Sequence, residues 1–251
     1  MWIGTSWKMN KGLDEARRYA RGLSDYVKAN ALPGVQPFII PSFTALAATR
    51  DELGADSPVL LGVQNAHWAD HGAWTGEVSV VQAKDAGAQL VEIGHSERRE
   101  HFGETVETTR LKVAATLAHG LVPLLCIGES AETKRAGDSS RFILDQAAGA
   151  LDGLNEEQLR RVLIAYEPIW AIGENGRPAT VEELKEPFAD LGREYGSRTR
   201  GLLYGGSVNT DNAEDLLGID HVTGLFIGRA AWQLPGYVRL LEMAAAQARP
   251  A

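Results

Sequence analysis

The amino-acid sequence predicts one (β/α)8 barrel domain that spans residues 1–251. Three observations support this fold class. Eight short apolar runs recur along the chain, segments of helical character separate them, and no linker or change in composition divides the chain. Strict alternation of strands and helices is typical of a parallel sheet, and a count of eight favours closure into a barrel.

The apolar runs have the length of buried parallel strands, which are apolar on both faces. They occupy residues 2–5, 36–40, 58–63, 89–93, 122–127, 162–166, 201–204 and 224–227. Helices are predicted at residues 13–31, 43–53, 78–86, 106–119, 139–151, 181–195, 212–217 and 237–248. In the first of these, apolar residues recur at three- and four-residue steps and charged residues fill the other face, as in an amphipathic helix.

An open, doubly wound sheet is the alternative fold. Dinucleotide-binding members of that class carry a Gly-x-Gly-x-x-Gly turn after the first strand. No such turn follows residues 2–5. The closed barrel is therefore the preferred prediction.

The net charge and the cysteine content limit the partners and the cellular compartment that we expect for this protein. The formal net charge is −8 and the pI is about 5.3, so we expect no nucleic-acid partner and no anionic membrane surface. The single cysteine, Cys126, excludes an internal disulfide and suits a reducing compartment. The N-terminal residues lack the pattern of a signal peptide, and no apolar run approaches the about 20 residues that span a bilayer. We therefore expect a cytoplasmic protein.

The stretch from Ala165 to Gly176 contains a candidate catalytic residue at the end of a predicted strand. A predicted strand ends at Tyr166, Glu167 follows directly, and a proline and several glycines then indicate a loop. Barrel enzymes place catalytic groups at the carboxyl ends of strands, where the following loop can close over a substrate. Glu167 is thus a candidate catalytic base, although a carboxylate here could also cap the next helix.

Other candidate residues follow other strands. Lys8 follows the first predicted strand, His95 the fourth, Gly205-Gly206-Ser207 the seventh and Gly228-Arg229 the eighth. All these loops lie on one face of a barrel, so a lysine, an imidazole, a carboxylate and glycine-rich turns would converge. Glycine turns near helix starts suit a phosphate, but glycines also serve turns for purely conformational reasons. His95 could equally be a hydrogen-bonded core histidine.

Two further features favour ordinary structural roles. His67 and His71 flank Asp70, but loop histidines at this spacing are mostly just exposed, so no metal site is predicted. Cys126 lies near a strand end with no activating partner close to it in sequence. We expect it to be a small core residue rather than a nucleophile.

Four segments together resemble the triosephosphate isomerase family, in the family's order along the chain. They are Trp7-Lys8-Met9-Asn10, Gly94-His95-Ser96-Glu97-Arg98-Arg99, Tyr166-Glu167-Pro168-Ile169-Trp170-Ala171-Ile172-Gly173 and Tyr204-Gly205-Gly206-Ser207-Val208. The resemblance implies that Glu167 is the base and that a neutral His95 polarises the carbonyl. It further implies that Lys8 stabilises the enediolate, Glu97 supports the site, and Gly173, Ser207 and Gly228 bind the phosphate.

The sequence departs from the family pattern at three places. Ser6 stands where the family has Asn, the lid 173–179 is one residue longer than usual, and Arg229 replaces the second glycine of the last phosphate loop. Ser in place of Asn removes about two heavy atoms, as many as a hydroxymethyl group contains. Arg229 could add a charge-assisted contact to a phosphate or a hydroxyl. These changes favour a substrate with one more carbon.

With these departures the chain is similar to a family branch of tetritol (erythritol and threitol) catabolism, which interconverts L-erythrulose 1-phosphate and D-erythrulose 4-phosphate. The alternative is a triosephosphate isomerase that interconverts dihydroxyacetone phosphate and D-glyceraldehyde 3-phosphate. A non-catalytic sugar-phosphate sensor is disfavoured, because a binding protein has no use for a base beside a carbon acid. No metal or organic cofactor is expected, since acid-base groups suffice. The resemblance also implies a homodimer, in which the loop 71–77 places Thr75 near the partner's site.

Overall fold

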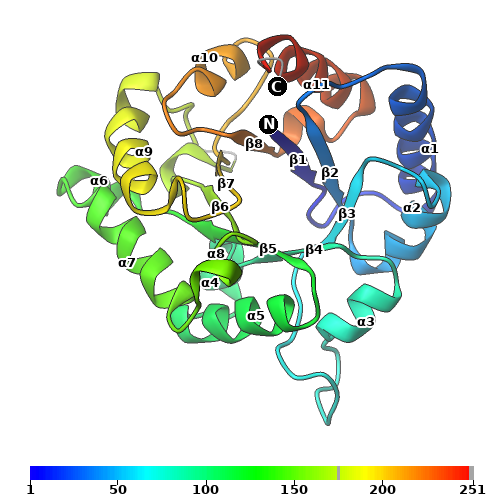
Figure 1. Cartoon of the computed structure of the whole chain (residues 1–251), viewed down its shortest axis with the longest axis horizontal. Helices are drawn as coiled ribbons and strands as arrows, with labels where there is room; N and C mark the ends of the chain where they lie inside the picture. The colour runs from blue at the N-terminus through cyan, green and yellow to red at the C-terminus, as the bar shows by residue number, and fades with distance from the viewer. Residues whose placement is uncertain (174–175, 249–251) are drawn as a thin grey trace.

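The computed structural model describes residues 1–173 and 176–248, which form a closed barrel of eight parallel strands. Figure 1 looks along the barrel and shows the helices as a ring around the strands. The strands are β1 (Trp2–Ser6), β2 (Gln36–Ile40), β3 (Leu60–Val63), β4 (Leu90–Ile93), β5 (Val122–Ile127), β6 (Leu163–Tyr166), β7 (Gly201–Tyr204) and β8 (Gly224–Ile227). Each pairs with the next in sequence, and β8 pairs with β1. The predicted fold class is confirmed.

The eight predicted helices are confirmed, with small shifts at most of their ends. They are α1 (Leu13–Ala29), α2 (Leu46–Leu53), α3 (Val80–Asp85), α5 (Val106–Ala118), α7 (Ser139–Leu151), α9 (Val181–Tyr195), α10 (Ala213–Leu217) and α11 (Leu234–Gln247). The prediction for 78–86 began too early, because the Ser79 hydroxyl accepts a hydrogen bond from the Gln82 N–H and so caps α3. The 43–53 segment starts with a 3₁₀ turn, η1 (Phe43–Ala45).

Several short elements were not predicted. They are α4 (Ser96–His101), α6 (Ala131–Arg135), α8 (Glu156–Leu159), η2 (Ile169–Ala171) and η3 (Arg229–Ala231). Each is six residues long or shorter, with little room for a helical repeat of apolar residues, and each follows a strand in the same segment as a predicted helix. Three of them, α4, η2 and η3, lie at the carboxyl ends of strands and shape the mouth of the barrel.

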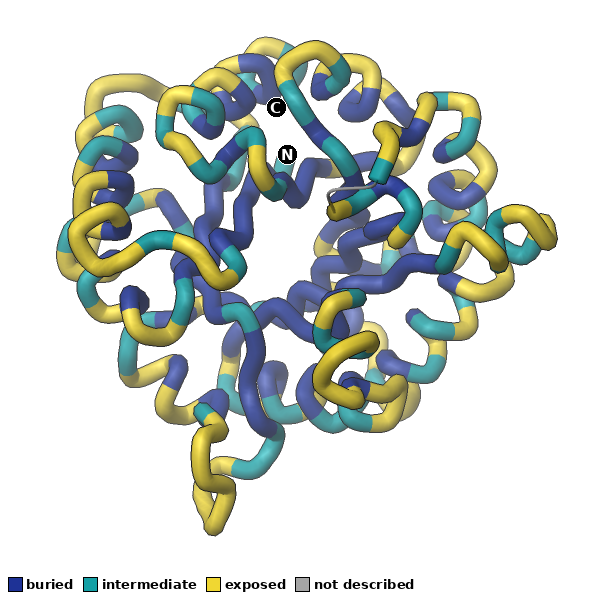
Figure 2. Tube along the Cα trace, turned by 180° about the vertical axis from the view of Figure 1, so that it is seen from behind, coloured by how far each residue is buried: buried dark blue, intermediate teal, exposed yellow. Residues whose placement is uncertain are grey.

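Buried residues form two layers of core. One lies between the strands and the surrounding helices, and the other fills the barrel. The barrel interior is made by alternate residues of the strands, among them Phe38, Leu90, Leu124 and Phe226. Figure 2 shows buried residues along the strands and exposed residues on the outer sides of the helices. A Cβ on Gly4 would lie 2.1 Å from the Phe38 ring, which explains the glycine in β1.

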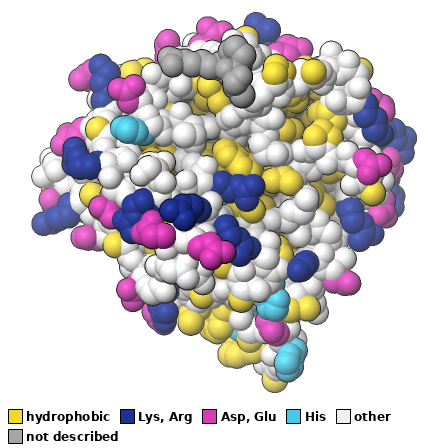
Figure 3. Space-filling model, viewed as in Figure 1, with side chains coloured by type: hydrophobic (Ala, Val, Ile, Leu, Met, Phe, Trp, Pro, Cys, Tyr) yellow, Lys and Arg dark blue, Asp and Glu magenta, His cyan; other side chains and the backbone are white. Residues whose placement is uncertain are grey.

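Within residues 1–173 and 176–248, no helix combines the length and apolarity needed to cross a bilayer. Lys and Arg side chains are interspersed with Asp and Glu on the face seen in Figure 3. The loop between β3 and α3 projects away from the barrel (Figure 1).

Candidate active site

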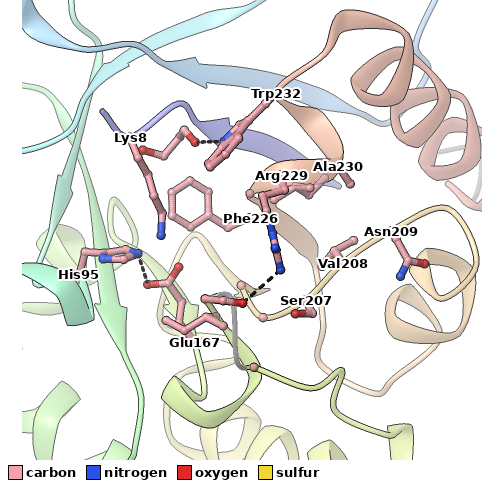
Figure 4. Close-up of a pocket in the computed structure, with 18 of the residues that line it drawn as sticks. Lys8, His95, Glu167, Ser207, Val208, Asn209, Phe226, Arg229, Ala230 and Trp232 are labelled. Atoms are coloured by element: carbon pink, nitrogen blue, oxygen red, sulfur yellow. Dashed lines mark hydrogen bonds and ion pairs between the residues drawn. The ribbon is translucent and has the colours of Figure 1, made fainter. Parts of the chain in front are cut away.

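A pocket of about 530 Å³ opens at the carboxyl ends of the strands. Its lining includes every predicted site residue of the described chain: Ser6, Lys8, His95, Glu97, Glu167, Gly173, Ser207, Gly228 and Arg229. Lys8, His95 and Glu167 point toward a common space in Figure 4. The volume lies within the about 300–1,000 Å³ that is usual for small-molecule sites. Of the predicted lid, Glu174 and Asn175 lie outside the described residues.

Glu167 stands directly after β6 and is only 4% exposed. Its backbone N–H donates to the Ile127 carbonyl at 2.7 Å, so the neighbouring strand fixes its position. A Cβ on Gly205 would lie 2.5 Å from the Glu167 Cγ, and the glycine therefore makes room for the carboxylate. Among the described residues, Glu167 Oε2 has no hydrogen-bond partner. A rigidly held carboxylate with an uncommitted oxygen is suited to accept a proton.

The backbone fixes the tautomer of His95. This residue caps the N-terminus of α4, and its Nδ1 accepts a hydrogen bond from the Glu97 N–H at 3.1 Å. A ring nitrogen that accepts a hydrogen bond carries no proton, so the neutral imidazole has its hydrogen on Nε2. Nε2 lies 3.8 Å from Glu167 Oε2 (Figure 4). The imidazole can thus donate to a substrate oxygen beside the base.

Lys8 is held by both its backbone and its side chain. Its φ of 50° lies in the left-handed region, and the Gln64 amide donates to its carbonyl at 2.8 Å. Nζ contacts Glu97 Oε1 at 2.6 Å. Partial burial raises the pKa of Glu97, but the Lys8 ammonium and His95 outweigh this effect and leave the pKa below its usual value. Glu97 is therefore a carboxylate that orients the lysine.

The predicted phosphate-binding residues are partly engaged by the lid. The Ser207 N–H and hydroxyl both donate to the Ala171 carbonyl, at 2.9 and 2.7 Å. Arg229 Nη2 donates to the Gly173 carbonyl at 3.1 Å (Figure 4). The Arg229 side chain thus lines the pocket and faces the first residue of the lid. Donation by Ser207 to a phosphate would replace its bonds to Ala171 in η2.

The base of the lid is anchored by a buried carboxylate that sequence reasoning missed. Glu129 Oε1 accepts hydrogen bonds from the Trp170 Nε1 at 2.8 Å and the Tyr166 hydroxyl at 3.1 Å. It also accepts from the Ser139 hydroxyl at 3.2 Å. These bonds hold η2, the turn that directly follows Glu167. The signal in the sequence was a glutamate at the carboxyl end of the fifth strand.

Glu92 was also missed, although a carboxylate inside an apolar run was the available signal. It lies on β4, is 3% exposed, and follows Leu90 on the interior side of the barrel. Burial, followed by the nearby carboxylate of Glu167, raises the pKa of Glu92 to about 8. At neutral pH the Glu92 side chain is therefore mostly a protonated acid.

The shifted pKa of Glu92 predicts a pH-dependent stability. Between its usual pKa of 4.5 and about 8 the folded state binds a proton that the unfolded state has lost. The free energy of unfolding then falls as pH rises through this window, by up to about 1.4 kcal/mol per pH unit. Glu92→Gln should remove this contribution. Denaturant unfolding from pH 5 to 8 measures it, and parallel curves for the two proteins would contradict the prediction.

Cys126 and Asp70 were considered for other chemistry, and the structure shows the surroundings of both. Burial raises the pKa of Cys126 well above its ordinary value, and the neighbouring Glu167 acts in the same direction. Such a thiol is a poor nucleophile. Asp70 Oδ1 contacts the His119 Nε2 at 2.6 Å. In the described residues no group of three His, Cys, Asp or Glu side chains is placed to hold a metal.

Known proteins resemble this chain in sequence and in fold over nearly its whole length. The sequence model described as triosephosphate isomerase matches residues 1–244. The chain belongs to the triosephosphate isomerase family. A triosephosphate isomerase from Bartonella henselae has a similar crystal structure, with a TM-score of 0.83, 31% sequence identity and coverage of 96% of this chain and 98% of that one.

Two relatives within the family are more similar in sequence. Both are named L-erythrulose-1-phosphate isomerase. The protein from Mycolicibacterium smegmatis is 85% identical over 98% of this chain and 94% of its own length. The protein from Rhizobium rhizogenes is 49% identical over 99% of this chain and 96% of its own length.

Proposed function

We propose that this chain is an isomerase that interconverts L-erythrulose 1-phosphate and D-erythrulose 4-phosphate. The observation that carries the proposal is the 85% identity, over nearly the whole chain, with a relative named for this substrate. The pocket is compatible with it, because Ser6 lies in the lining with Lys8 and Glu167 and has a small side chain. A substrate one carbon longer than a triose phosphate needs that space.

The reaction follows from the positions of the polar groups. Glu167 removes the C3 proton of L-erythrulose 1-phosphate, and a cis-enediolate forms across C2 and C3. His95 donates to the substrate oxygens and moves the hydroxyl proton from O3 to O2. Glu167 returns its proton to C2, which leaves the carbonyl at C3, and renumbering gives the 4-phosphate. Each proton removed is returned, so no oxidant or reductant is consumed.

Charge stabilisation and phosphate binding complete the mechanism. Lys8 lies opposite Glu167 and stabilises the negative charge of the enediolate, while Glu97 orients the lysine. Gly173, Ser207, Gly228 and Arg229 bind the phosphate, after Ser207 and Arg229 release their carbonyl partners on the lid. Closure of the lid excludes water and protects the enediolate from loss of phosphate.

The biological setting belongs to the same proposal. The enzyme acts in the cytoplasm, in the catabolism of tetritols such as erythritol and threitol. It works as a homodimer through the projecting loop 71–77, which includes Thr75. The Trp74 side chain in this loop is 50% exposed and contacts the His67 ring at a centroid distance of 4.4 Å. An exposed tryptophan on a protruding loop is suited to a protein contact.

Substrate preference tests the proposed function. On one enzyme preparation, kcat/KM should be higher for L-erythrulose 1-phosphate than for D-glyceraldehyde 3-phosphate. Ser6→Asn should reduce the tetrulose value by about 10- to 100-fold more than the triose value, because it refills the space of about two heavy atoms. A higher kcat/KM for the triose in the unsubstituted enzyme would instead favour a triosephosphate isomerase. Equal losses of kcat/KM for the two substrates in Ser6→Asn would refute the argument that Ser6 leaves space for the extra carbon.

A further inference from the structure

Two polar side chains meet inside the barrel, below the mouth of the pocket. Ser6 is the last residue of β1 and Glu92 lies on β4. Alternate residues of each strand face the barrel interior, as Gly4 does against Phe38 and as Leu90 does in the interior core. Ser6 and Glu92 each lie two residues further along these strands. Both therefore point into the barrel just beneath the pocket.

Both side chains are buried and have unpaired polar atoms. Ser6 is 4% exposed and Glu92 is 3% exposed. Within the described part of the chain, neither Ser6 Oγ nor Glu92 Oε2 has a hydrogen-bond partner within 3.5 Å. A buried polar atom without a partner is unfavourable, and native proteins keep few of them outside functional sites. A polar group placed between the two atoms would satisfy both of them better than they satisfy each other.

The two side chains are close to each other and to the proposed base. Burial and then Glu167 raise the pKa of Glu92, whereas hydrogen bonding from the Ser6 hydroxyl lowers it. The Ser6 hydroxyl and the Glu92 carboxyl therefore lie at the outer limit of hydrogen-bonding distance from each other. Ser6 also lines the pocket beside Glu167. A substituent on the carbon that Glu167 deprotonates would therefore extend toward Ser6, which lines the pocket, and toward Glu92, which lies behind the lining.

We propose that Ser6 and Glu92 form a hydroxyl-binding subsite that recognises the terminal hydroxymethyl group of a tetrulose phosphate. This inference rests on the proposed function and names the residues that would read the extra carbon. A serine hydroxyl and a protonated carboxyl can each donate and accept a hydrogen bond. The terminal hydroxyl of the substrate can therefore accept from one of them and donate to the other.

The subsite explains how one hydroxymethyl group can determine specificity. Empty space alone discriminates weakly, because a triose phosphate also fits a larger pocket. A triose phosphate, however, leaves Ser6 and Glu92 without a hydroxyl partner. Sites that hydrogen-bond a substrate hydroxyl reject the analogue that lacks it much more strongly than apolar pockets do.

Ligand binding to a catalytically inactive variant tests the subsite. In Glu167→Gln, calorimetry would compare the affinities of L-erythrulose 1-phosphate and dihydroxyacetone phosphate. Adding Glu92→Leu or Ser6→Ala should weaken tetrulose binding by about 10- to 100-fold and change triose binding by less than about threefold. Glu92→Gln, which keeps a donor and an acceptor, should retain most of the tetrulose affinity. Glu186→Gln, on the exposed face of α9, is the matched control.

The outcomes separate this inference from the proposed function. Equal weakening of both ligands would mean that Glu92 supports Glu167 rather than the substrate, and would overturn the subsite. Unchanged binding of both ligands would overturn it as well. If Glu92→Leu fails to fold, the Ser6→Ala result decides. An unsubstituted enzyme that does not turn over the tetrulose would refute the function, whereas selective binding in the inert background would still support the subsite.

Discussion

Replacing Glu167 with Gln is expected to lower kcat by about 100- to 10,000-fold, the range that a positioned general base contributes. The substitution keeps the size of the side chain and its fit against Gly205, but the amide cannot accept the substrate proton. Exchange of the substrate C–H proton with solvent, followed by NMR in D2O, should fall in parallel. Both readouts report the same proton transfer, so they must fall together.

Binding of a phosphate-bearing ligand provides the control for this substitution. Glu167→Gln should bind such a ligand with little change, because the phosphate is proposed to contact other residues of the pocket. Glu186→Gln should leave both turnover and exchange intact. Persistent C–H exchange in Glu167→Gln would show that another group is the base. Loss of both turnover and ligand binding would show that the substitution had disrupted the pocket.

Replacing Lys8 with Met should lower kcat/KM by about 100- to 1,000-fold, as expected when a preorganised charge is removed from a site where negative charge develops. Methionine keeps much of the length of the side chain and loses the ammonium. The loss should appear mainly in kcat. The negative charge on the substrate oxygens O2 and O3 develops only as the enediolate forms in the transition state. Steady-state kinetics with the tetrulose phosphate measures this division.

An exposed lysine supplies the matched control. Lys28 lies on the surface of α1, so Lys28→Met removes an equal charge away from the pocket and should leave kcat/KM unchanged. A Lys8→Met enzyme in which only KM rises would show that Lys8 binds the ground state, through the phosphate, rather than stabilising the enediolate. A loss of the same size in Lys28→Met would indicate a general effect of net charge.

Much of the fold was predictable because its determinants are local. An apolar run such as 122–127 is long enough to be a strand and too short to be a helix, and α7 and α9 were placed at their observed bounds. The short helix α4 was not predicted, because its stability comes from capping and packing rather than from a repeat of apolar residues. The His95 cap of α4 shows this, since the capping atom is an imidazole nitrogen and not one of the usual cap side chains.

The sequence by itself determined the barrel and the convergence of Lys8, His95 and Glu167. The physical reason is topological: in a closed parallel barrel every strand ends on the same face, so a residue that follows a strand must lie there. The tertiary structure alone decided how these groups are partnered. Which backbone N–H meets His95 Nδ1, which carbonyl receives Arg229 and which hydroxyl faces Glu92 depend on ångström distances between segments far apart in sequence. The sequence did not single out Glu129 or Glu92, and only burial beside specific neighbours gave them roles in anchoring the lid and, as we propose, in recognising the substrate.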